Sequence, residues 1–380
     1  MEGIFYRDGT PVSIKINGDR IAEIIRKSSL DDPKKKHLFV APGLVDNQVN
    51  GYVSVAFSDE GLTVEGVRKA TEALWRAGVT TFLPTLTTNS RQLLLQNFRI
   101  FTQALQDPQL QLSIPGFHLE GPYISPLDGF RGAHLKKWVR PPDWREFMEF
   151  FKAADGKILE VSLAPEIEGA FDFIRRCREL GIVVALAHHN ASAEIIKRAI
   201  DAGAVLSTHL GNGCSNMINR HENPLWPQMA DDRLMASIIV DGFHLRPEEV
   251  QVFFKVKGAE RILLTSDVTH FAGMAPGKYT VKGRTVVLSP EGKITLIKEN
   301  ILAGAALPIT QGIGNLMRFT QCSLAEAIHA AGRNQARLFG LKDRGELVQG
   351  MRADLIFFTI DDYIVHIKKT VLAGKVVYRI

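Results

Sequence analysis

The middle of the chain alternates between short apolar runs and longer amphipathic segments. Runs rich in β-branched and apolar residues predict eight strands, at 43–48, 79–84, 113–120, 159–166, 182–188, 204–209, 236–242 and 262–267. The intervening segments, such as 63–78 and 170–181, repeat apolar residues every third or fourth position and end in glycine, which predicts helices. Eight such repeats favour a (β/α)₈ barrel over an open doubly wound sheet.

Both ends of the chain carry a different pattern, with β-branched and aromatic runs separated by turns. Asp-Gly and Asn-Gly dipeptides near the N-terminus favour tight hairpins. We expect residues 1–42 and 347–380 to form one small β-sandwich domain beside a barrel of residues 43–346. Hairpin-like sequence at 279–297 interrupts the barrel rhythm, and a surface excursion is preferred there over a substrate lid.

Composition places the chain among ordinary globular proteins. Its 380 residues are 45% hydrophobic, which is enough for a large core, and charges of both signs are interspersed. The net charge of +5 suits a small anionic substrate. The one dense basic run, Lys34–Lys36, predicts a solvated loop rather than a nucleic-acid patch, so no nucleic-acid partner is expected.

Cysteine usage and hydropathy bear on location. The three cysteines form neither a CxxC pair nor an even-numbered framework, so neither disulfides nor a thiolate metal site is expected. No apolar stretch reaches the ~18 residues of a membrane span, and the N-terminus lacks a signal-peptide layout. A cytoplasmic protein without a membrane partner is the expectation.

Four ionisable residues, Glu120, His188, His209 and Asp267, stand at the ends of predicted strands. Catalytic groups of (β/α)₈ barrels lie at these carboxyl ends. A carboxylate and two imidazoles match the ligands of a hydrolytic zinc ion, and Asp267 is the candidate general base and acid. A lone histidine is more often a core residue and Glu120 could cap a loop, but their joint placement favours a metal site. The adjacent His189 is expected to be structural.

Nearby loops hold further candidates. His244, after the seventh strand, can hydrogen-bond a substrate carbonyl or hydroxyl. Asn212 and Gly213 offer amide N–H groups to an oxyanion such as phosphate, and Arg220 adds a planar guanidinium. His134 can reach the substrate from the loop after the third strand or lie on the surface. For each residue the alternative is an ordinary connecting loop.

The segment after the first strand bears on the number of metal ions. Many two-metal barrel hydrolases place two histidines there as HxH, whereas this chain has Gln48 and Asn50. Amides are poor zinc ligands beside imidazole. No lysine ends the fourth strand, so a carboxylated-lysine bridge is not expected either. One divalent ion is predicted, with Gln48 and Asn50 as hydrogen-bonding neighbours.

A family resemblance rests on ordered motifs rather than on any one of them. The chain resembles the N-acetylglucosamine-6-phosphate deacetylases of the amidohydrolase superfamily over nearly its whole length. The motifs that carry the likeness are APGLVDNQVNG, HLEGPYIS, AHHNAS, STHLGNG, IVDGFHL, LLTSDVT and LAGAALPITQG. The resemblance implies one zinc ion on Glu120, His188 and His209, with Asp267 as acid and base and His244 polarising the acetyl carbonyl.

The same resemblance implies how substrate is held. His134 matches a substrate-contacting histidine, and Leu307 falls near the acetyl pocket. Asn212, Gly213 and Arg220 fall where the family holds phosphate, and in the family that arginine can come from the neighbouring subunit. A homodimer is therefore implied as well.

Two loops depart from the family pattern. The sequence HLGNGCSNMINRHENPLW replaces the usual HLFNAM-type motif, and the bulky residues 268–271 follow the aspartate. The expected function is hydrolytic deacetylation of an N-acetyl amino sugar 6-phosphate, foremost N-acetylglucosamine 6-phosphate to glucosamine 6-phosphate and acetate. The alternatives are N-acetylgalactosamine 6-phosphate or an unphosphorylated N-acyl sugar as substrate, or a non-catalytic amidohydrolase-like binding protein.

Overall fold

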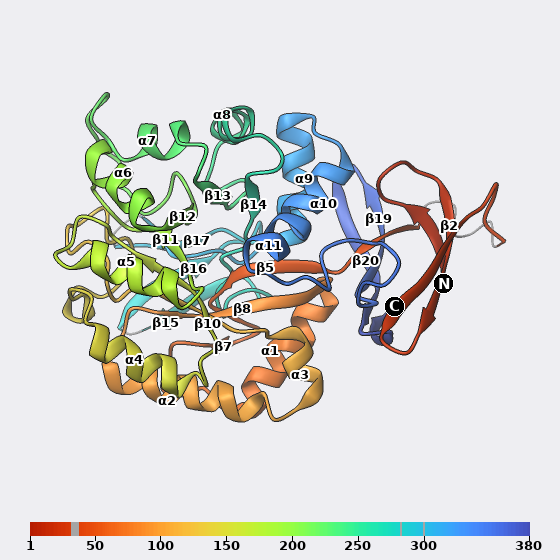
Figure 1. Cartoon of the computed structure of the whole chain (residues 1–380), viewed down its shortest axis with the longest axis horizontal. Coiled ribbons are helices and arrows are strands. Elements are labelled where there is room, and N and C mark those ends of the chain that lie inside the picture. Colours follow the sequence, from red (N-terminus) through yellow and green to blue (C-terminus); the bar gives the residue numbers. More distant parts are fainter. Residues whose placement is uncertain (32–37, 282, 299–300) are drawn as a thin grey trace.

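The computed structural model consists of a barrel and a separate sheet, and both chain ends lie in that sheet (Figure 1). It describes residues 1–31, 38–281, 283–298 and 301–380. The predicted solvated loop at Lys34–Lys36 lies outside the described residues. No helix in these ranges is long and apolar enough to cross a membrane.

Eight parallel strands form the barrel in sequence order. Their bounds are β5 Leu44–Val49, β8 Val79–Thr87, β9 Phe117–Glu120, β10 Ile158–Leu163, β11 Val183–Leu186, β12 Ala204–Ser207, β13 Met235–Ile238 and β14 Ile262–Leu264. A parallel bridge between Val49 and Val268 brings the first and last strands together. All of β5 and β9 is buried, as parallel strands covered on both faces require. The predicted (β/α)₈ barrel is confirmed.

The predicted strand at 113–120 begins later in the structure, because β9 starts only at Phe117. Ser113 is the last residue of helix α3, Pro108–Ser113, whose first amides are capped by Asp107 and whose first turn contains Pro108. Residues 114–116 lie in neither element. Strands β10 to β14 also end two to four residues before the predicted boundaries.

Amphipathic helices surround the barrel. In α1, Thr63 accepts a hydrogen bond from the amide of Gly66 at the N-cap, and Val67, Ala70 and Leu74 bury one face. The other helices also bury part of their surface, although α5, α7, α9 and α11 have no side-chain N-cap bond. The bounds are α1 Val64–Arg76, α2 Arg91–Ala104, α4 Trp144–Ala153, α5 Ala170–Glu179, α6 Ala193–Ala202, α7 Leu225–Ala230, α8 Pro247–Lys257, α9 Ile309–Thr320, α10 Leu324–Ala330 and α11 Arg333–Leu338.

The two chain ends meet in one seven-stranded sheet, as their predicted pairing requires. Its order is β21-β20-β19-β4-β1-β2-β3. One contact between the ends is the antiparallel pairing of β4 with β19, where the rings of Phe39 and Phe358 stack at 5.7 Å between centroids. The strands are β1 Glu2–Phe5, β2 Pro11–Asn17, β3 Arg20–Arg26, β4 Phe39–Pro42, β19 Leu355–Asp361, β20 Ile364–Leu372 and β21 Lys375–Arg379.

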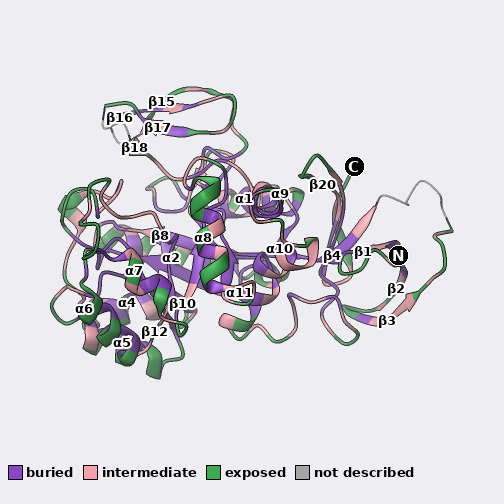
Figure 2. Ribbon diagram, turned by 90° about the horizontal axis from the view of Figure 1, so that it is seen from above, coloured by how far each residue is buried: buried purple, intermediate pink, exposed green. Residues whose placement is uncertain are grey.

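The sequence after the last barrel strand forms a further antiparallel sheet. Its strands are β15 Gly277–Val281, β16 Arg284–Leu288, β17 Ile294–Leu296 and β18 Ile301–Leu302. This inserted sheet stands off one side of the barrel in Figure 2. It has its own apolar cluster, which packs Val286, Leu288 and Leu296 against Phe271 from the loop after β14. The short hairpin of β6 Gly51–Tyr52 and β7 Val55–Ala56 follows β5.

Candidate active site

Three predicted metal ligands converge at the carboxyl ends of the barrel strands β9, β11 and β12. Glu120 ends β9, while His188 and His209 lie two residues beyond the ends of β11 and β12. The Nε2 atom of His209 lies 3.0 Å from Glu120 Oε1, and the Nε2 atom of His188 lies 3.4 Å from the same oxygen. All three side chains are at least nine-tenths buried. The parallel register of the strands thus brings together residues that are up to 89 positions apart.

Backbone conformation contributes to this convergence. His188, His209 and Asp267 have φ angles of +50°, +34° and +50°, in the left-handed region that few non-glycine residues adopt. Such a conformation costs of order 1–3 kcal/mol, and it persists only where surrounding contacts impose it. For His209 one such contact is the hydrogen bond from its amide to Ser237 Oγ, at 2.9 Å. Three non-glycine residues in this region at one site mark it as functional.

Hydrogen bonds orient the rings toward the carboxylate. His188 Nδ1 donates to the carbonyl of Phe130 at 3.0 Å, and this bond holds the ring with Nε2 toward Glu120. Burial by itself would raise the pKa of Glu120, but its bonds to His188 and His209 offset this and place that pKa well below its ordinary value. Glu120 is therefore an anion beside two imidazole nitrogens, which is the donor set that a divalent metal prefers.

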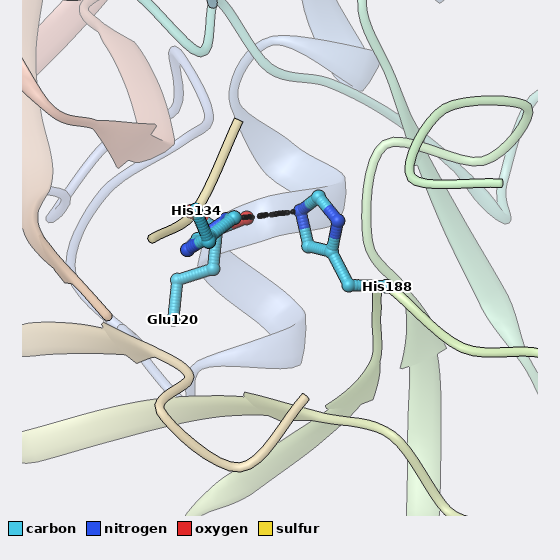
Figure 3. A group of neighbouring side chains, drawn as sticks. All are labelled: Glu120, His134 and His188. Atoms are coloured by element: carbon cyan, nitrogen blue, oxygen red, sulfur yellow. Dashed lines mark hydrogen bonds and ion pairs between the residues drawn. The ribbon is translucent and has the colours of Figure 1, made fainter. Parts of the chain in front are cut away.

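His134 joins this group more closely than its predicted role implied. Its Nε2 lies 3.2 Å from His188 Nε2, and one ligand atom each from Glu120, His134 and His188 lie within 4.8 Å of one another (Figure 3). Burial and the neighbouring His188 lower the pKa of His134 to about 3, so its ring is neutral. The structure thus offers four metal-ligating side chains where sequence reasoning named three.

Two side-chain amides at the end of β5 donate hydrogen bonds to the carboxylates of the site. Gln48 Nε2 donates to Glu120 Oε1 at 3.0 Å, and Asn50 Nδ2 donates to Asp267 Oδ1 at 2.6 Å. Burial, followed by the charge of Glu120, raises the pKa of Asp267 to about 6. A carboxyl group in that range can both accept and release a proton near neutral pH.

His244 faces the same cavity and has a partner that sequence reasoning missed. Its Nδ1 lies 2.7 Å from Asp241 Oδ2, and the other oxygen of Asp241 accepts the amides of Phe243 and His244. These bonds fix the ring and leave Nε2 for a ligand. The signal for Asp241 was present in IVDGFHL, where an aspartate precedes a histidine by three residues.

Of the residues predicted to contact the phosphate and the acetyl group, some line the cavity and others do not. Asn212 and Gly213 line it. Arg220 is exposed and is not among the lining residues, and its carbonyl accepts a hydrogen bond from the indole of Trp226. Leu307 also lies outside the lining and packs next to Gly292. A single chain therefore brings two of these four residues to the cavity.

The cavity that contains these residues has a volume of about 300 Å³. One wall consists of the barrel groups Glu120, His188, His209 and Asp267. The opposite wall comes from the inserted sheet, whose contributions are Val281, Arg284, Val286, Leu296 and Leu302. The insertion therefore forms part of the site, as in the lid alternative, and the preferred interpretation as a surface excursion was wrong.

A second layer of polar groups lies inside the barrel. Asn47 Nδ2 donates to Glu160 Oε2 at 3.0 Å, and His118 Nε2 lies 2.7 Å from Ser162 Oγ. Burial raises the pKa of Glu160 to about 8 and lowers that of His118 to about 4, so both side chains are neutral at pH 7. These two side chains therefore add no formal charge to the barrel interior.

Comparison with known proteins agrees with this architecture. The amidohydrolase family model matches residues 39–377, and the chain belongs to that family. A curated N-acetylglucosamine-6-phosphate deacetylase from Bacillus subtilis is 30% identical over 84% of this chain and 80% of its own. An N-acetylgalactosamine-6-phosphate deacetylase from Escherichia coli O157:H7 is 29% identical over 83% and 82%. The crystal structure of a Thermotoga maritima N-acetylglucosamine-6-phosphate deacetylase superposes with a TM-score of 0.87 at 28% identity, covering 100% of this chain and 99% of that one.

Membership of the amidohydrolase family implies a metal-dependent hydrolase with a divalent ion. The buried carboxylate and imidazoles at the strand ends are suitable ligands for that ion.

Proposed function

We propose that this chain hydrolyses the acetyl amide of N-acetylglucosamine 6-phosphate to give glucosamine 6-phosphate and acetate. The observation that carries the proposal is the convergence of Glu120, His188 and His209 with Asp267 in one cavity. The named activity of the B. subtilis and T. maritima relatives, which align over most of the chain, supports this substrate over the alternatives. A non-catalytic binding protein would have no use for a carboxyl group with a raised pKa beside a ligand set.

We further propose that the metal is a single zinc ion held by Glu120, His188 and His209. The donor set fits, because an anionic oxygen and two imidazole nitrogens are typical of catalytic zinc sites. Gln48 and Asn50 bind carboxylates instead of offering a second ligand set, which supports one ion over two.

A divalent ion at this site would polarise the amide carbonyl and acidify a water molecule. Asp267, oriented by Asn50, is placed to accept a proton from the attacking water and to deliver it to the leaving amine. His244, held by Asp241, presents Nε2 for a hydrogen bond to the acetyl carbonyl. His134 is neutral and lies next to His188, where it can contact a substrate bound beside the metal ligands.

We propose that Asn212 and Gly213 hold the phosphate and that Leu307 approaches the acetyl group. We also propose a homodimer in which Arg220 reaches the phosphate bound by the partner subunit. The exposed position of Arg220 outside the cavity of its own chain supports an intersubunit role. We also propose a cytoplasmic location and domain boundaries at 42/43 and 346/347.

Acetate release from a panel of sugars tests the proposed function. The panel contains N-acetylglucosamine and N-acetylgalactosamine, each with and without the 6-phosphate. The expected result is the highest kcat/KM for N-acetylglucosamine 6-phosphate. A higher kcat/KM for N-acetylgalactosamine 6-phosphate would make that sugar the assigned substrate. Absence of acetate release from all four sugars would overturn the proposal. Metal analysis of the same sample should give about one zinc ion per chain, and two would contradict the single-metal proposal.

A further inference from the structure

The cavity holds little positive charge for an anionic substrate. Among the described residues that line it, the acids are Asp59, Glu120 and Asp267, and Arg284 is the one lysine or arginine. Within this lining, Arg284 is therefore the one lysine or arginine of the same chain whose charge can attract a phosphate dianion.

Arg284 is held in place by the inserted sheet. It is the first residue of β16, and Val286 and Leu288 of the same strand belong to the apolar cluster around Phe271. Two residues apart on a strand lie on the same face, so the cluster fixes the side of the sheet from which Arg284 projects. Arg284 is partly buried, and its guanidinium reaches the loop that carries Ala133.

The guanidinium has spare hydrogen-bonding capacity. Arg284 Nη2 donates to the carbonyl of Ala133 at 3.3 Å, a long hydrogen bond. Its Nε is buried and has no hydrogen-bond partner among the described residues. An arginine carries five N–H donors in a planar fork, and a buried donor without a partner is costly. This arginine therefore lines the cavity with donors that the protein itself does not satisfy.

We infer that Arg284 of the inserted sheet binds the 6-phosphate of the substrate within its own chain. This inference rests on the proposed function, because it assumes a sugar 6-phosphate in the cavity. The planar fork of arginine binds phosphate with paired hydrogen bonds. Arg284 thus acts as a specificity-determining residue that selects the phosphorylated sugar, and it has no part in amide hydrolysis.

Steady-state kinetics of Arg284→Gln and Arg284→Lys test this assignment. Arg284→Gln should raise KM for N-acetylglucosamine 6-phosphate by about 10- to 100-fold, as for loss of a hydrogen bond to a charged group, with kcat changed by less than about twofold. KM for unphosphorylated N-acetylglucosamine should not change. Arg284→Lys should fall between, because lysine keeps the charge but loses the fork. The inhibition constant of inorganic phosphate should rise in parallel.

The matched control is Lys278→Gln on β15 of the same sheet, where the side chain is exposed and outside the cavity lining. It removes the same charge and should leave every constant unchanged. An unchanged KM and phosphate inhibition constant in Arg284→Gln would overturn the inference while the proposed function stood. Equal rises in KM for both sugars would also overturn it, because they would place Arg284 on the sugar ring. Absence of acetate release by the wild-type enzyme would instead refute the proposed function.

Discussion

The two walls of the cavity are built by different means. The barrel wall consists of residues at or just beyond strand ends, and its members are buried and held by the parallel register of the sheet. The wall from the inserted sheet consists of side chains on short antiparallel strands with an apolar cluster separate from the main core. We therefore propose that the chemistry resides on the barrel and that substrate selection resides on the inserted sheet.

The separation of the two clusters makes the comparison testable. Substitutions in the barrel wall should change metal content or turnover, whereas substitutions in the inserted sheet should change substrate affinity. Four expected outcomes follow from the physical differences between the walls, in order of decreasing effect.

Loss of a barrel-wall ligand should have the largest effect. His209→Ala removes a buried imidazole beside Glu120 and should reduce both the bound metal and acetate release to background. Metal analysis and an acetate assay on the same sample check this outcome. His221→Ala, at an exposed histidine of the same loop region, is the control and should retain both. Full metal content in His209→Ala would remove His209 from the ligand set.

The next effect is expected at the proton carrier. Asp267→Asn keeps the size of the side chain but cannot exchange a proton, so kcat should fall by about 10²- to 10⁴-fold. Metal content and the unfolding midpoint should remain near wild-type values, which separates a lost proton transfer from a lost fold. Undiminished turnover would show that another group carries the proton.

A substitution in the inserted sheet should act on affinity. Leu288 is buried in the apolar cluster of that sheet and does not line the cavity. Leu288→Ala removes buried methyl groups and should loosen the sheet locally, since such cavities cost about 2–5 kcal/mol. We expect a several-fold higher KM, faster proteolysis within residues 273–305, and unchanged metal content. If Leu288→Ala lowered the unfolding midpoint of the barrel as much as that of the inserted sheet, the two walls would unfold as one cooperative unit.

The smallest effect on activity is expected in the buried layer of the barrel. Between pH 4.5 and about 8, folded Glu160 holds a proton that the unfolded chain has released, so stability should fall as pH rises through this window. Glu160→Gln should remove this slope, because the amide stays neutral and still accepts from Asn47. Between pH 5 and pH 8 the free energy of urea unfolding should fall by a few kcal/mol more for the wild type than for Glu160→Gln. Equal falls in the two proteins would refute a protonated Glu160.

Much of the barrel was predictable because its signals are local. Each strand is a short apolar run, each helix has its own stripe and cap, and a residue at the end of a run must lie at the end of a strand. Glu120, His188 and His209 could be found for that reason. The boundary at residue 113 could not, because Asp107 and Pro108 begin a helix inside an otherwise apolar segment. For the hairpin-like sequence at 279–297 a surface excursion was preferred over a lid, because a hairpin pattern does not state what the hairpin covers.

The sequence by itself determined the fold class, the order of strands and helices and the kinds of ligand near the strand ends, because each depends on neighbours a few residues apart. Only the tertiary structure decided which distant groups meet. It joined Asp241 to His244, brought His134 to His188, left Arg220 outside the cavity, and placed Arg284 in its wall. Those pairings depend on the path of loops and on the packing of a separate apolar cluster, which no local pattern encodes.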